Sequence, residues 1–345
     1  DLVVDGVTVN LNVANTYVGP TFIRNSGTLN ATVVGALPTG TRSALTFDGT
    51  GTSVLTLGAA QSVASLTAAS TATITLNANT ITVGDVASNT TFAGAIGGTG
   101  GLTKDGASTQ VLSASNGYSG TTTVSDGTLS ITGSINSSAT IAVNGGLLST
   151  SGVNKLSNTA AVTVSGGTLT IGGNDEVGSL VLTSGTIGGS ATLTAATYGL
   201  ESGTVTGNLG AGTLTKSTVG TVALNGTAGA ATVNVTAGAL TLGASSAINS
   251  ATTVAISGGS LNLGANNQIG NAAVTVSGAG ILNLNTFSDT VSTFAMSGGS
   301  LNGSGTLTAT TYGLSGGTVT ANLGGGTINS SGTVALNGTA SATTV

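Results

Sequence analysis

The chain contains no cysteine, histidine or tryptophan, and among its 345 residues only two are proline and one is methionine. The absence of cysteine excludes disulfides and thiolate chemistry. Two prolines are too few for a collagen helix, which needs proline together with a strict Gly-X-Y period. The chain is nevertheless 39% hydrophobic with a mean hydropathy of +0.43. Disordered chains are poorer in apolar residues, so we expect a folded protein.

Charge is equally scarce. Only 4% of the residues are charged, against about 25% in an ordinary soluble domain. Five cationic residues and a net charge of −5 leave little to meet phosphates, so no nucleic-acid partner is predicted. No apolar run approaches the ~18 residues of a membrane-spanning helix.

The 58 glycines belong to a repeat. The triplet Gly-Thr-Leu and its variants recur from Gly127–Leu129 to Gly317–Val319 in ten steps that average 19. Short stretches alternate small polar residues with Ile, Leu and Val, and stop at Asn-Gly or Ser-Gly-Gly, as strands and turns do. A period near 19 is typical of one coil of a β-solenoid.

A second, longer period lies over the first and corresponds to six coils. Leu102–Lys104 returns as Leu214–Lys216, and a segment starting at Ala191 returns at Gly305. We therefore predict one continuous solenoid over residues 1–345 with about 18 coils, built from repeat units at approximately 1–101, 102–213, 214–327 and a truncated 328–345. The chain stops within a unit and shows no polar capping coil, so we expect either a longer protein or ends covered by neighbours.

One segment carries a family resemblance. Thr90–Ile131 resembles the passenger-associated β-strand repeat of bacterial autotransporters, and the second half of the motif returns at Ala14–Leu29 and, without its tyrosine, at Leu224–Leu240. The residues that match are Phe92, Gly94, Ile96, Gly98, Gly100, Leu102, Thr103, Lys104, Gly106, Leu112, Asn116, Tyr118, Gly120, Thr122, Val124, Gly127, Thr128 and Leu129.

The resemblance implies an all-β fold, a right-handed parallel β-helix. It also implies export across a Gram-negative outer membrane, with display at the cell surface or release into the medium. The translocator of that family is expected to lie outside this chain.

A parallel β-helix accounts for several residue choices. Inward positions should form ladders of medium aliphatic side chains, and Leu129, Leu148, Leu169, Ile187 and Val205 share one phase of the repeat. The glycine before each Thr-Leu is expected to supply a turn with positive φ. Asparagines near the corners are expected to form hydrogen-bonded ladders, and outward faces should be neutral, rich in Thr, Ser and Ala.

No catalytic, cofactor-binding or metal-binding residue is predicted, and no cofactor. The adjacent acidic pair Asp175–Glu176 lies in a Gly-rich stretch and is expected to be a solvated loop; the corresponding segment of the next unit keeps only Asp289. A glycosidase needs two carboxyls at a defined separation, whereas neighbours on a strand point to opposite faces. No small-molecule substrate is therefore predicted.

The remaining polar candidates are also expected to be structural. Arg24 and Arg42 are the only arginines, too few for a phosphate or carboxylate clamp. Lys104 and Lys216 share a phase and are expected in solvated turns. The tyrosines Tyr118, Tyr198 and Tyr312 are expected to pack at corners. An ice-binding array of threonines is disfavoured, because no single Thr-x-Thr register repeats from coil to coil.

These features predict a non-catalytic extracellular structural β-solenoid that forms a surface fibre, stalk or sheath. Its expected partners are copies of itself, packed laterally or end to end, and the outer membrane through a separate translocator. The alternative is the shaft of an adhesin passenger that mediates attachment or biofilm formation. A degradative β-helix enzyme is disfavoured, because clustered Asp, Arg and Lys are missing.

Overall fold

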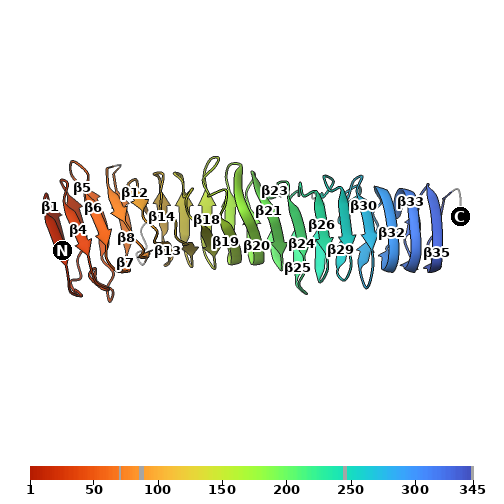
Figure 1. The fold of residues 1–345 in the computed structure, drawn as a ribbon, viewed down its shortest axis with the longest axis horizontal. Coiled ribbons are helices and arrows are strands. Elements are labelled where there is room, and N and C mark those ends of the chain that lie inside the picture. The colour runs from red at the N-terminus through yellow and green to blue at the C-terminus, as the bar shows by residue number, and fades with distance from the viewer. Residues whose placement is uncertain (70, 85–88, 244–246, 343–345) are drawn as a thin grey trace. The chain divides into compact units, whose positions relative to one another are not determined.

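A computed structural model describes residues 1–69, 71–84, 89–243 and 247–342. Every regular element in these ranges is a β-strand, and Figure 1 shows the strands as successive turns coloured along the chain. Within the same ranges no helix has the length and apolarity needed to cross a membrane. The backbone contacts divide the chain into two compact units, Asp1–Gly178 and Ser179–Val345.

The strands of the first unit are mostly three to five residues long, because Gly, Asn and Ser turns interrupt them. They are β1 (Leu2–Asp5), β2 (Thr8–Leu11), β3 (Thr21–Arg24), β4 (Thr28–Ala31), β5 (Ala44–Asp48), β6 (Val54–Leu57), β7 (Gln61–Val63), β8 (Ser65–Ala68), β9 (Thr73–Thr75), β10 (Ile81–Val83), β11 (Thr90–Phe92), β12 (Ala95–Gly97), β13 (Leu102–Lys104), β14 (Thr109–Leu112), β15 (Thr122–Val124), β16 (Thr128–Ile131), β17 (Thr140–Val143), β18 (Leu147–Thr150) and β19 (Ala161–Ile171). Strand β20 (Asp175–Gly188) starts in this unit and ends in the next.

The second unit continues with shorter and longer strands. They are β21 (Thr192–Leu200), β22 (Gly203–Val205), β23 (Asn208–Leu209), β24 (Thr213–Lys216), β25 (Thr221–Leu224), β26 (Thr232–Val235), β27 (Ala239–Leu242), β28 (Thr253–Ile256), β29 (Ser260–Asn262), β30 (Ala273–Val276), β31 (Ile281–Asn283), β32 (Asp289–Asn302), β33 (Thr306–Val319), β34 (Asn322–Leu323) and β35 (Thr327–Leu336).

Strand pairing in each unit is parallel and links one coil to the next. In the first unit one column runs β7, β10, β13, β15 and β17, a second runs β5, β8, β11, β14, β16 and β18, and a third runs β2, β4, β6, β9 and β12. In the second unit β24, β26, β28 and β30 form one column, and β25, β27, β29 and β31 another. The residues that the structure describes form about 17 turns, about 19 residues apart, so the predicted parallel β-solenoid is confirmed.

The step between turns varies because the turns absorb extra residues. In the first unit Leu2 pairs with Thr21 and Thr21 with Leu45, and the second of these steps is the longer. In the second unit the step from Val319 to its partner Leu336 is shorter than either. Whether a single continuous solenoid extends over residues 1–345 stays a prediction.

Burial alternates along the strands, so that side chains two residues apart point inward. Leu129, Leu148 and Leu169 stack on one another in adjacent coils and are fully buried. The predicted ladder is thus confirmed for these residues, and Ile187 pairs with Val205 as expected. Each fully buried Leu contributes about 1.5–3 kcal/mol of hydrophobic stabilisation.

The coil after Val205 does not follow the spacing of the triplets. Gly220–Val222 is the variant of the triplet that comes after Gly203–Val205, yet Val205 pairs with Leu224 and Val222 with Gly203. The shift is two residues, and the side-chain period of a strand is also two, so both Val222 and Leu224 still point inward. The inward face therefore stays hydrophobic when the pairing shifts by two residues, and the spacing of the triplets in the sequence does not reveal that shift.

Two further predictions about turns are confirmed in part. Gly127 and Gly238, which precede Thr-Leu and Ala-Leu, have φ of 61° and 64°, whereas Gly220 does not lie in the left-handed region. The Asn283 amide donates to Asn262 Oδ1 at 3.3 Å at the ends of β31 and β29, as the prediction of ladders near corners expects. The Asn30 amide also donates to Asn10 Oδ1 at 2.7 Å, but these two residues lie within β4 and β2 and not at a corner.

Candidate functional site

A buried tyrosine organises a hydrogen-bonded network at one corner of the first unit. Tyr118 is fully buried, and its hydroxyl lies 2.7 Å from Thr122 Oγ1. Thr122 Oγ1 in turn lies 2.9 Å from Ser138 Oγ, which donates to the Gly120 carbonyl at 2.9 Å. Ser138 belongs to the next coil, so a chain of three hydroxyls ties two consecutive coils together at a corner.

The same network occurs near the N-terminal end of the first unit. The Tyr17 hydroxyl lies 2.7 Å from Thr21 Oγ1, Thr21 Oγ1 lies 3.0 Å from Ser43 Oγ, and Ser43 donates to the Gly19 carbonyl at 2.8 Å. Both networks follow the spacing Tyr-x-Gly-x-Thr. The family motif includes the tyrosine and Thr122, but the hydroxyl contacts of the threonine and the serine were not predicted. The constant spacing between Tyr and Thr is the signal in the sequence that points to the first of these contacts.

Lys104 is buried, and the prediction of a solvated turn is wrong. Because Lys104 is two residues from the inward Leu102, it also points inward, between Val83 and Val124 of the adjacent coils. Its ammonium donates to the Asp105 and Gly106 carbonyls, both at 2.6 Å. Burial lowers the pKa of Lys104, and the nearby carboxylates of Asp105 and Asp126 offset part of that change.

Lys216 repeats this arrangement in the second unit and corrects the same prediction. It pairs with Val235 of the next coil, is fully buried, and donates to the Thr218 carbonyl. Burial lowers its pKa, and Glu201 acts in the opposite direction. A hydrogen bond to a charged group contributes about 1.5–3 kcal/mol, so each lysine stabilises the turn that follows its strand.

Asp175 and Asp289 are buried, which also corrects the expectation of a solvated loop. The Asp175 carboxylate accepts hydrogen bonds from the backbone N–H of Lys155 at 2.8 Å and of Glu176 at 3.0 Å. Asp289 accepts from the N–H of Gln268 at 2.8 Å and of Ile269 at 2.9 Å. Each carboxylate therefore binds backbone donors of the preceding coil. Glu176 is exposed, as predicted.

The two aspartates predict a pH dependence of stability. Burial raises the pKa of Asp175 and of Asp289, and the backbone N–H donors only partly offset it. A raised pKa in the folded state means that the stabilisation is fully present below the unfolded pKa, about 3.9, and is lost as the pH rises through the folded pKa. The free energy of unfolding should therefore contain a component that decreases above pH ~4.

We expect the double substitution Asp175→Asn and Asp289→Asn to remove this component. Urea unfolding at a series of pH values gives the difference in free energy between variant and wild type, and that difference should move in favour of the variant as the pH rises. Ser165→Ala, at an exposed position and without an ionisable group, is the control and should give a nearly constant difference. A constant difference for the double variant would contradict the assignment.

Tyr198 and Tyr312 are buried packing residues, but they lie within β21 and β33 and not at a turn between strands, so the predicted corner position is not where the structure places them. Their exposed fractions are 1% and 0%. The Tyr198 hydroxyl accepts from the Ala195 N–H at 2.8 Å and donates to the Leu193 carbonyl at 3.1 Å. The Tyr312 hydroxyl makes the equivalent bonds to Ala309 and Leu307, both at 2.9 Å. These hydroxyls bind backbone groups of their own strands instead of linking hydroxyl side chains.

Both arginines form ion pairs. Arg42 binds Asp105 in a bidentate manner, with Nη1 to Oδ1 at 2.6 Å and Nη2 to Oδ2 at 2.9 Å. Arg24 Nε lies 2.9 Å from Asp48 Oδ1, and its guanidinium lies 5.0 Å from the centroid of the Phe22 ring. Each guanidinium is thus bound by an aspartate of this chain.

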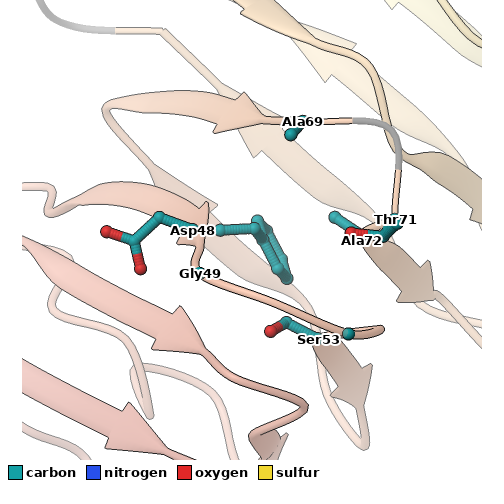
Figure 2. A pocket seen from close by; sticks show the side chains of 8 residues that line it. Asp48, Gly49, Ser53, Ala69, Thr71 and Ala72 are labelled. Carbon is teal, nitrogen blue, oxygen red and sulfur yellow. The ribbon is translucent and has the colours of Figure 1, made fainter.

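A small cavity of about 10 Å³ lies beside Phe47 and is lined by Gly51, Ser53 and Thr71 among others. Figure 2 shows the Asp48 carboxylate directed away from Ser53 and Ala72. Ser53 Oγ is buried without a hydrogen-bond partner among the described residues. This volume is about that of one water molecule, so the cavity does not fit a substrate.

A larger hollow of about 440 Å³ lies between the turns around Asn15 and Thr39 in the first unit. Its lining includes Val18, Pro38 and Thr41 and contains no ionisable side chain. Within the described ranges, no three His, Cys, Asp or Glu side chains gather where they could hold a metal ion. The buried tyrosines, lysines and aspartates instead bind hydroxyl and backbone groups of the parallel β-solenoid itself.

Comparison with known proteins identifies the repeat. Residues 8–31 and 102–131 match the family model described as the passenger-associated-transport-repeat. The resemblance seen at Ala14–Leu29 and Thr90–Ile131 is thereby confirmed for most of its length, whereas the weaker instance at Leu224–Leu240 lies outside both matched ranges. Each matched range contains one Tyr-x-Gly-x-Thr motif, and the second also contains Lys104.

The repeat is that of autotransporter passenger β-helices. It indicates an extracellular or cell-surface protein. No curated protein and no solved structure gives a significant match to the chain.

Proposed function

We propose that this chain is a non-catalytic structural segment of the bacterial surface, a stalk, fibre or sheath component built by stacking coils. The observation that carries the proposal is the use of its buried ionisable side chains. Lys104, Lys216, Asp175 and Asp289 each bind the backbone of their own or the preceding coil. A β-helix enzyme would present carboxylate and ammonium groups of this kind to a substrate, but here they are hydrogen-bonded to backbone groups of the solenoid.

The passenger-associated-transport repeat supports the same role. Passengers of this type are exported, so we propose that a separate translocator in the outer membrane of a Gram-negative cell carries the chain outward. A solenoid lengthens by adding coils that contact only their neighbours. Its mechanical continuity comes from main-chain pairing between coils and, at the corners, from contacts such as Thr122 to Ser138.

Electron microscopy of the purified chain tests this role, with material released from the native cell surface as a comparison. Filaments of stacked chains on the grid and on cells are the expected result. Dispersed single particles at every concentration, together with specific binding of the chain to host or abiotic surfaces, would instead favour the adhesin shaft.

The non-catalytic part of the proposal has its own assay. Purified chain is incubated with a panel of acidic and neutral polysaccharides, with and without Ca²⁺, and depolymerisation is followed by viscosity and reducing ends. No change is expected. Depolymerisation that disappears when Asp175 and Asp289 are replaced together would establish a degradative enzyme.

A further inference from the structure

A file of threonines runs along one face of the second unit. Eight residues occupy the same outward position in eight successive coils, and seven of them are threonine. This threonine file consists of Thr197, Thr213, Thr232, Thr253, Ala273, Thr293, Thr311 and Thr327. All eight side chains are half-buried or exposed, so none of them belongs to the core.

The file is in register because each member pairs directly with the next. Parallel strands lie about 4.8 Å apart, which sets the spacing of the hydroxyl and methyl groups along the file. Thr253 Oγ1 lies 3.4 Å from Thr232 Oγ1, so adjacent hydroxyls can meet along it. The sequence did not reveal this register, because the unequal steps between members hide a ladder that pairing makes regular.

The surface around the file carries almost no charge. After Lys216 the sequence contains a single charged residue, Asp289, and its side chain is 1% exposed. Charge repulsion, which ordinarily keeps protein surfaces apart, is therefore lacking on this part of the unit. A strongly charged partner would find no opposite charge to bind on this surface.

A hollow lies next to the file. The residues two positions further along β32 and β33 are small, Ala295 and Gly313, and with Thr275 and Ser315 they line a cavity of about 140 Å³. Thr293 and Thr311 precede these small residues on the same strands. The face thus combines a ridge of threonines with an adjacent depression.

We propose that the threonine file is a lateral contact with a second copy of this chain. A second copy has the same coil spacing, so its own file stays in step over several coils, and in-register stacks of identical side chains interdigitate into dry interfaces. A ridge beside a depression is self-complementary under a two-fold axis, which is the commonest symmetry of dimers. This inference rests on the proposed structural role and names the surface that it uses.

Sedimentation velocity of the full chain over a range of concentrations tests the contact. Wild type is expected to associate reversibly. The double substitution Thr293→Arg and Thr311→Arg places like charges opposite one another across the interface and should weaken self-association by at least about tenfold, an effect that added salt reduces. Thr253→Arg, two levels away in the same file, is a second variant should the double one fold poorly.

Thr318→Arg is the matched control. Thr318 lies on β33, as Thr311 does, but it pairs with Ser300 and Ala335 in the neighbouring column. The Thr318→Arg variant should associate as wild type does. Circular dichroism verifies the fold of each variant. Wild type that remains monomeric, or equal losses in Thr318→Arg and the file variants, would overturn the contact. Filaments that persist unchanged in the double variant would overturn it while leaving the structural role intact.

Discussion

Gly100→Ala is expected to destabilise the first unit by at least about 3 kcal/mol. A Cβ added at Gly100 would lie 1.7 Å from the backbone carbonyl oxygen of Asn79 in the preceding coil. Backbone atoms cannot rotate away as a side chain does, so the two coils would have to separate. Coils are held at about 4.8 Å by main-chain hydrogen bonds, including the Gly100 N–H to the Asn77 carbonyl at 2.7 Å.

Gly97→Ala, at the end of β12 three residues before Gly100, is the matched control. A Cβ at Gly97 meets no atom within 4 Å, so its effect should stay within about 0.5 kcal/mol. The second unit offers an equivalent pair of variants. A Cβ added at Gly305 would lie 1.6 Å from the Phe287 carbonyl oxygen, whereas a Cβ added at Gly325 meets no atom within 4 Å, so Gly305→Ala should be destabilising and Gly325→Ala should not. Urea unfolding followed by circular dichroism measures all four. Similar midpoints for Gly100→Ala and Gly97→Ala would show that the coils separate more easily than we infer.

The second large effect is expected at alkaline pH, where the tyrosines should remain neutral until the protein unfolds. The chain has four tyrosines and no tryptophan, so tyrosinate absorbance reports them directly. Burial raises the pKa of Tyr17, Tyr118, Tyr198 and Tyr312, and hydrogen bonds to the hydroxyls offset part of the change. Tyr118, fully buried in its hydroxyl network, is raised furthest.

The direction in which the free energy of unfolding changes with pH follows from the difference in pKa between the folded and the unfolded state. A folded pKa above the unfolded value of about 10 gives stabilisation that is complete below that value and is lost as the pH rises toward the folded pKa. Lys104 and Lys216 act in the opposite direction, since their lowered pKa makes their contribution grow up to about pH 10.4. Above that pH only the tyrosine effect continues, and the free energy of unfolding should fall steeply.

A spectrophotometric titration checks this expectation. Tyrosinate should appear late, cooperatively and together with the loss of the β-sheet signal, whereas the chain in urea should titrate near pH ~10. Tyr118→Phe should remove one of the four chromophores and lower the free energy of unfolding by about 1 kcal/mol at neutral pH, because a buried hydroxyl bond is lost. Ionisation near the unfolded value with the β-sheet signal intact would refute the burial of these hydroxyls.

Several features of the fold follow from local patterns. The period near 19, the alternation of burial and the ladder Leu129–Leu148–Leu169 were all predictable, because a parallel solenoid repeats the same environment in every coil. The passenger-associated repeat was recognisable for a related reason. Its Gly, Tyr and Thr positions correspond to close approaches and hydroxyl contacts that only those residue types supply at a corner.

Other features depend on which residues the coils bring together. Lys104 and Asp175 look like surface residues in a Gly-rich sequence, but alternation turns both inward, and backbone groups of the turns bind their charges. The partner of Thr122 is Ser138, which lies in the next coil. No local pattern links those two residues.

The sequence by itself determined the solenoid class, the coil length and the inward aliphatic face, since each depends on spacing along one strand and its turn. Only the tertiary structure decided the register between coils, such as Val205 on Leu224, and with it the threonine file. The physical reason is that turns take up variable numbers of residues, and a shift by two leaves every side chain on its own face. Pairing between coils, and not residue count, therefore fixes which side chains become neighbours.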